Sequence, residues 1–224
     1  MARRRSGVFS ARLAWLVLGA SLLRAQDPAV PAHPLRASPN TLFYFLEMSG
    51  APQGEFRPLT QDQRARAYVR GLLSPFAIVQ AAASAGLGQW RDVPRPWGQE
   101  EAGYSRRLAD YLGREVVQHS LRWGLESVLH EDNRYFQSGR TGAWGRVKYA
   151  LASSVLARKD SGSRCFSLSQ VGSLAGTAFL SRTWQPATDS SPEHGAISFG
   201  IALASNAGMH VFKEFLPDLL HRRP

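Results

Sequence analysis

The spacing of apolar side chains constrains the fold of this 224-residue chain more than any other feature. From residue 59 onward they recur every three or four residues, and no stretch alternates convincingly with a period of two. This pattern predicts an all-α fold, a compact bundle of about six helices. The expected helices cover roughly 61–73, 75 to the glycines at 86 and 88, 100–130 with a bend at Gly113, 143–158, 167–181 and 195–216.

Burial must hold this bundle together. The chain is 44% hydrophobic, and its single cysteine, Cys165, cannot form an internal disulfide. Two sequence signals mark helix starts. Thr60 with Gln63 fits a capping box, and Ser74-Pro75 places a favoured cap residue before a proline at the first helical position.

The first 25 residues have the layout of a secretory signal. Four arginines among residues 3–12 precede an apolar run from Leu13 to Leu23, and Ala25 follows as a candidate cleavage position, with an uncleaved anchor as the alternative. Residues 26–58 contain six of the 13 prolines and are expected to form a linker or docked tail. The predicted organisation is therefore a signal peptide over 1–25, a Pro-rich linker over 26–58 and a helical domain over 59–221.

The charge balance argues against nucleic acid as a partner. The formal net charge is +10, but residues 1–25 contain five arginines and no acid, so the rest of the chain carries +5. These basic residues are scattered rather than clustered. They are compatible with an anionic membrane surface, where each basic residue contributes about 1 kcal/mol of attraction.

Small residues form two stripes at helical spacing. Ala196, Gly200, Ala204 and Gly208 fall four apart on the last predicted helix, and Gly172 and Gly176 form a GxxxG pair on the helix before it. Such stripes allow helices to approach closely, within one chain or between like chains. The last helix is apolar nearly all round, which fits either the centre of a bundle or insertion into a membrane.

A polar stripe on the predicted 100–130 helix offers a possible metal site. Glu115, His119, Arg122, Glu126 and His130 are spaced by three or four residues. Imidazole and carboxylate from His119, Glu126 and His130 form a ligand set that zinc or iron accepts. Arg122 in its middle repels a cation, so a solvated face with ion pairs is the alternative.

The turn after this helix holds a second group of polar residues. Asp132, Arg134 and Tyr135 are expected to pin the loop through a carboxylate–arginine pair, with Tyr135 and Phe136 packed beneath. Ligand binding by these residues is the alternative.

Three segments resemble a family of uncharacterised exported bacterial proteins of the acidobacterial type. They are His130-Glu-Asp-Asn-Arg-Tyr-Phe136, the Arg-x-x-Tyr-Ala-Leu segment 146–151, and the ending from Asn206 to Asp218. In that family a Leu-His-x-Asp-Pro-Arg-Tyr-Phe turn and a Phe-x-Pro-Asp terminus recur, and here Asn133 replaces the proline. The resemblance covers roughly 100–218. It implies export and an envelope setting, and it points to neither a reaction nor a cofactor.

The sequence does not reveal a biochemical activity. It lacks a GxSxG elbow, a Walker loop, HExxH, an EF-hand loop and a Rossmann fingerprint. We expect a non-enzymatic, exported, envelope-associated helical protein, with no cofactor, whose partner is an anionic membrane surface or a second copy. The alternatives are a metal-dependent enzyme built on the His/Glu stripe and a bundle that binds a small ligand or lipid.

Overall fold

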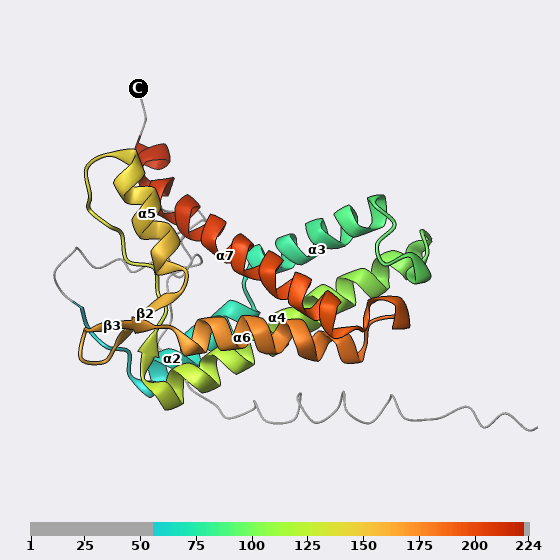
Figure 1. Ribbon diagram of the computed structural model, residues 1–224, viewed down its shortest axis with the longest axis horizontal. Helices are drawn as coiled ribbons and strands as arrows, with labels where there is room; N and C mark the ends of the chain where they lie inside the picture. Colours follow the sequence, from blue (N-terminus) through green and yellow to red (C-terminus); the bar gives the residue numbers. More distant parts are fainter. Residues whose placement is uncertain (1–55, 222–224) are drawn as a thin grey trace, which may run out of the picture. The chain divides into compact units, whose positions relative to one another are not determined.

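The computed structural model describes residues 56–221, with side chains up to Leu219. The predicted signal segment 1–25 lies outside the described residues, as does nearly all of the linker 26–58. The helices are α2 (Gln61–Leu72), α3 (Pro75–Trp90), α4 (Glu101–Leu129), α5 (Ala143–Ser153), α6 (Leu168–Leu180) and α7 (Pro192–His221) (Figure 1). Short 3-10 turns lie at Arg95–Trp97, Ser181–Thr183 and Ala187–Asp189. The all-α expectation is confirmed for the described residues, with a small sheet added to it.

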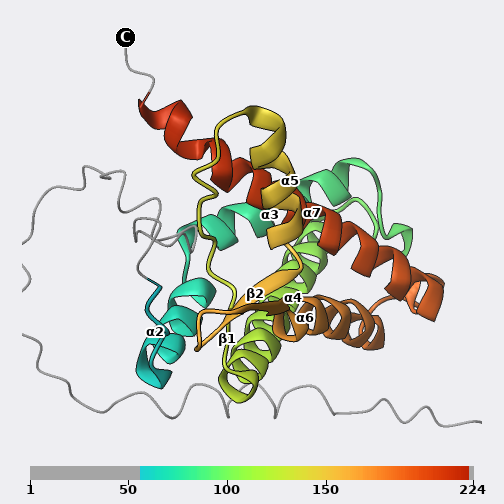
Figure 2. The ribbon, with the colours of Figure 1, turned by 60° about the vertical axis from the view of Figure 1, so that its left-hand side comes forward.

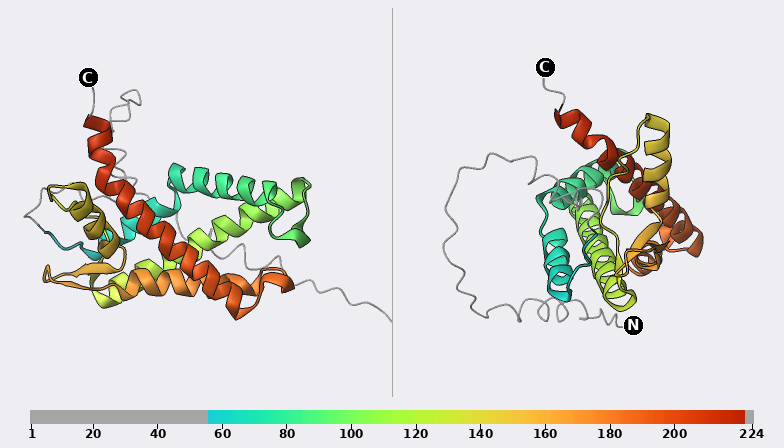
Figure 3. Two further views of the ribbon diagram at one scale, coloured as in Figure 1. Left: turned by 45° about the horizontal axis from the view of Figure 1, so that its top comes forward. Right: turned by 90° about the vertical axis from the view of Figure 1, so that its left-hand side faces the viewer.

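Helix α4 is the centre of the packing. Helices α2, α3 and α6 each contact it, and α6 runs beside it in both Figures 1 and 2. Helix α7 crosses α6 obliquely and contacts α5 near its own C-terminal half (Figure 3). The helix predicted to be central by its apolar composition is therefore an outer one.

Local sequence signals place most helix ends. Thr60 and Gln63 form the expected capping box, each side chain bonded to the backbone N–H of the other. Ser74 precedes Pro75 as expected but makes no capping hydrogen bond. The prediction that α3 ends at Gly86–Gly88 is wrong, because the helix continues to Trp90, and α4 runs without interruption through Gly113.

A three-stranded antiparallel sheet replaces the end of the predicted 143–158 helix. Helix α5 ends at Ser153, and β2 (Leu156–Lys159) then pairs with β1 (Glu131–Asp132) and with β3 (Arg164–Phe166). Each strand has four residues or fewer, too short to show a period of two. Residues 160–163 form the hairpin turn between β2 and β3, and Gly162 in it has a φ of +83°.

Helix α7 exceeds its predicted range of 195–216 at both ends and continues through Pro217. Pro217 lies inside the helix and does not end it, although it removes one backbone donor. Arg146 donates to the Glu214 carbonyl at 2.6 Å.

The interior of the described chain is unusually polar. Its most completely buried large side chains include Arg64, Arg107, Tyr135, Glu131 and Glu214. The buried hydrophobic residues are mostly alanines, and a buried cluster joins the rings of Tyr135 and Tyr149 with Ala150. Each buried charge is hydrogen-bonded, as burial away from water requires.

Candidate functional site

The segment from His130 to Phe136 connects α4, the sheet, α6 and α7. His130 ends α4 in the left-handed conformation, with φ at +54°, and its Nδ1 lies 2.9 Å from the Asp160 carboxylate. Asp132 accepts from the backbone and guanidinium of Arg134, at 2.6–3.0 Å. Arg134 also donates to the Arg57 carbonyl at 3.0 Å.

Two residues of this segment hold the start of α6. Glu131 is 1% exposed and accepts from the Ser169 amide and hydroxyl at 2.9 and 2.5 Å. A carboxylate at a helix N-terminus is stabilised by the unpaired amides and the helix dipole. Asn133 accepts from Ser167 at 2.5 Å and donates to Ser169 at 2.7 Å. The polar turn is thus part of the fold's internal framework.

A second buried network joins the same segment to α7. Glu214 accepts from the Tyr135 hydroxyl at 2.6 Å, from the Ser138 amide at 3.0 Å and from Arg146 Nε at 3.0 Å. Burial alone would raise the pKa of Glu214, but hydrogen bonds from Ser138, Tyr135 and Arg146 outweigh it and hold that pKa below its usual value. Burial, followed by the bond to Glu214, raises the pKa of Tyr135.

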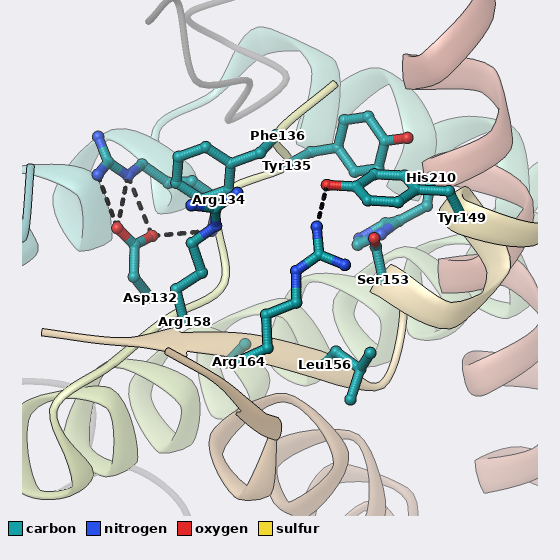
Figure 4. Close-up of a pocket in the computed structure, with 11 residues that line it drawn as sticks. Asp132, Arg134, Tyr135, Phe136, Tyr149, Ser153, Leu156, Arg158, Arg164 and His210 are labelled. Carbon is teal, nitrogen blue, oxygen red and sulfur yellow. Dashed lines mark hydrogen bonds and ion pairs between the residues drawn. The ribbon is translucent and has the colours of Figure 1, made fainter. Parts of the chain in front are cut away.

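A polar cavity lies beside these networks, between the sheet, α5 and α7 (Figure 4). The cavity is open to solvent, and its space of about 310 Å³ counts this open part as well. Its lining residues come from five elements and the segment after β1: Asp132, Arg134, Tyr135, Phe136, Tyr149, Ser153, Leu156, Ala157, Arg158, Arg164 and His210. Three of them are arginines and one is a carboxylate, so the cavity carries excess positive charge.

The sheet places two of these arginines side by side. Arg158 of β2 is directly opposite Arg164 of β3 and, on its other side, opposite Asp132 of β1. The Arg158 guanidinium lies 4.4 Å from the centre of the Phe136 ring and 5.5 Å from that of Phe56. Arg164 donates to the Tyr149 hydroxyl at 2.8 Å. Sequence reasoning missed both arginines because it placed them at the end of a helix and in a loop.

The three residues of the predicted metal site have three different sets of partners. His119 Nε2 lies 3.4 Å from Glu115 and its ring packs against Gly71 of α2. Glu126 accepts from Asn133 at 2.8 Å and lies 3.6 Å from Arg122, while His130 pairs with Asp160. Within residues 56–221 no group of three or more His, Cys, Asp or Glu side chains is placed to hold a metal.

The two small-residue stripes have opposite surroundings. Gly172 and Gly176 face α4, where an added Cβ would lie 3.3 Å from Leu125 and 2.8 Å from Leu121. Ala196, Gly200, Ala204 and Gly208 are all exposed, and nothing in the described chain lies within 4 Å of a Cβ added at 200 or 208. In the described residues this stripe therefore does not pack within the chain, and packing against a like chain stays a prediction.

Helix α7 turns a different side toward the protein. Gly195, His210 and Glu214 are buried, and Asn206 donates to the Ser154 carbonyl at 3.0 Å. The close approach to α6 occurs at Gly195, where an added Cβ would lie 2.7 Å from the Phe179 ring. The polar residues Asn206, His210 and Glu214 thus mark the inward side of α7, whereas the small stripe, Ile197 and Ile201 are exposed.

Comparisons of this chain with known protein families, curated proteins and solved structures return no match.

Proposed function

We propose that this chain is a non-enzymatic, exported protein of the cell envelope that attaches to a membrane surface by the outward sides of α3 and α7. The single observation that carries this proposal is the reversed arrangement of α3. This helix buries Ala81 and Ala85 and exposes Ile78, Val79 and Trp90 by 54%, 65% and 80%. A helix in water favours the opposite arrangement, since burying an aliphatic side chain of this size stabilises by about 1.5–3 kcal/mol.

Helix α7 also exposes large apolar side chains. Ile197, Ile201 and Phe212 are exposed on the side that also carries Gly200 and Ala204. No Asp, Glu, Lys or Arg occurs from Gly195 to Met209. Exposed apolar surface of this extent is typical of an interaction site.

Within residues 56–221, two stretches are long and apolar enough to cross a membrane, Gln61–Trp90 and Pro192–Leu219. Only 17% and 11% of the residues in their most apolar windows are buried, whereas the core helix of a water-soluble bundle is mostly buried. Their composition favours hydrocarbon as the covering medium. Trp90, at the end of α3 beside Arg91, suits the boundary between lipid and water, where tryptophan is enriched.

The proposal is surface attachment, with α7 lying along the membrane. The inward side of α7 carries His210 and the ion-paired Glu214, and ionisable groups are costly in hydrocarbon. A helix with one apolar and one polar side lies in the plane of the interface. The net charge of +5 beyond residue 25 and the resemblance to exported bacterial proteins support an anionic envelope membrane.

Vesicle flotation of the full chain tests this function. The expressed protein, its N-terminus determined by mass spectrometry, is mixed with phosphatidylcholine vesicles with or without phosphatidylglycerol. The wild type is expected to float with the anionic vesicles, and Ile78→Glu combined with Val79→Glu is expected to remain in solution. Val128→Glu is the matched control, because Val128 is 76% exposed but belongs to α4.

Three outcomes contradict the proposal. A wild type that stays in solution as an oligomer favours covering of the apolar side by a second copy. Flotation that the α3 substitutions leave unchanged assigns binding to a retained leader. Equal loss in the Val128 control assigns binding to apolar surface in general.

A further inference from the structure

We propose that the cavity lined by Arg158 and Arg164 binds a phosphate group. This inference is independent of membrane attachment, since a phosphate group occurs both in soluble compounds and in lipid head groups.

The cavity contains uncompensated positive charge. Asp132 is buried and both of its oxygens accept from Arg134, so this carboxylate is already neutralised by one arginine. Arg164 donates to Tyr149, a neutral group. Among residues 56–221, Arg158 has ring contacts but no hydrogen-bond acceptor or ion-pair partner. Two guanidinium charges therefore remain for a ligand.

In the protein without a bound anion, the register of the sheet places the two positive charges where they repel each other. Arg158 and Arg164 are directly opposite in the β2–β3 pair, and like charges in that position destabilise a sheet. Packing against Phe136 and Tyr149 orients the two guanidinium groups but does not neutralise them. An anion bound between them would remove the repulsion.

The available donors suit phosphate. Arginine presents several N–H groups in a fixed planar arrangement that matches phosphate oxygens, and two such groups on neighbouring strands can contact different oxygens. The Tyr149 and Ser153 hydroxyls lie on the same cavity wall, on α5 (Figure 4). The cavity is open to solvent, so an anion in solution can reach the arginines that line it.

The test uses the full chain and two probes. Isothermal titration with inorganic phosphate, in buffer of fixed chloride concentration, is expected to give saturable binding. Arg158→Gln and Arg164→Gln are each expected to weaken it about tenfold or more, since each removes a charge-assisted contact. Arg106→Gln is the matched control, because Arg106 is exposed on α4 and lies outside the cavity.

The second probe is a set of vesicles containing phosphatidylglycerol. Binding of vesicles but not of inorganic phosphate, lost in both cavity variants and kept in Arg106→Gln, would identify a lipid head group as the source. Binding of inorganic phosphate identifies a soluble source. Both results support the site.

Hydrogen exchange on the wild type tests the site without depending on a variant that folds. Phosphate is expected to slow exchange of the β2 and β3 amides relative to the same concentration of chloride. No change at these amides, together with no saturable binding of inorganic phosphate and with vesicle binding that both cavity variants keep, overturns the proposal. Equal weakening in Arg106→Gln also overturns it, because the binding would then follow net charge alone.

Discussion

The Tyr135 hydroxyl donates to Glu214 Oε2 over 2.6 Å and links the segment after α4 to the last turns of α7, 79 residues later. Both side chains are 1% exposed. Arg146 of α5 completes the junction, bonding to Glu214 and to Asp218. This junction fixes which side of α7 faces inward, and therefore which side is exposed for the proposed membrane contact.

Replacing Tyr135 by phenylalanine tests this junction. Tyr135→Phe is expected to lower the free energy of unfolding by about 1.5–3 kcal/mol, the contribution of a hydrogen bond to a charged acceptor. Urea denaturation measures the change. In the control Tyr104→Phe, the lost bond to the Ala82 carbonyl is 3.5 Å long, and the expected change is below about 0.5 kcal/mol. Equal effects in the two variants would show that the bond from Tyr135 to Glu214 does not stabilise this junction.

The same carboxylate predicts a dependence of stability on pH. The pKa of Glu214 is lowered by folding, so its contribution is present above its unfolded pKa of about 4.3 and is lost as pH falls through the folded value. Below about pH 4.3 the wild type is therefore expected to lose stability more steeply than Glu214→Gln. The free energy of unfolding measured against pH checks this, and parallel curves for the two proteins would disprove it.

Two glycines of α7 form a matched pair. Gly200→Ala is expected to stabilise the protein by about 0.5–1 kcal/mol, because alanine favours a helix and its Cβ meets open space. Gly195→Ala is expected to destabilise it, because the new Cβ would lie 2.7 Å from the Phe179 ring. Thermal unfolding without lipid distinguishes them. Destabilisation by Gly200→Ala would mean that something covers the stripe.

Asn133 provides a further test of the internal framework. Asn133→Ala removes bonds to Ser167, Ser169 and Glu126 and is expected to cost about 1–3 kcal/mol of unfolding free energy. Ser163→Ala, in the exposed hairpin turn, serves as the control and is expected to stay within about 0.5 kcal/mol. Chemical denaturation of both variants makes the comparison. A change at Asn133 no larger than the control would show that the turn does not organise α6.

The helices could be predicted from sequence because their periodic apolar residues and caps are local signals. The capping box at Thr60 shows this best. The sheet could not, since its strands are too short to display a period and its register depends on partners distant in sequence. The pairing of Arg158 with Arg164, which creates the positive cavity, could not be predicted for the same reason.

The side of α7 that faces inward could not be predicted for a different reason. Its small stripe and its large apolar residues are both compatible with close packing, so composition alone does not choose between them. Three polar residues, Asn206, His210 and Glu214, decide the orientation through partners on other elements. The polar stripe on α4 was ambiguous in the same way, because the partners of His119 and Glu126 include residues outside that helix.

The most direct measurement places a fluorescent probe at Ile201, on the outward side of α7. The chain carries Cys165→Ser and Ile201→Cys and is labelled with an environment-sensitive dye. Addition of anionic vesicles is expected to shift the emission to the blue, and quencher-bearing lipids are expected to reduce it, whereas a probe at Ser161 in the hairpin turn stays unchanged. If the Ile201 probe keeps its aqueous spectrum after anionic vesicles are added, as the Ser161 probe is expected to do, α7 does not meet lipid and the proposed attachment is wrong.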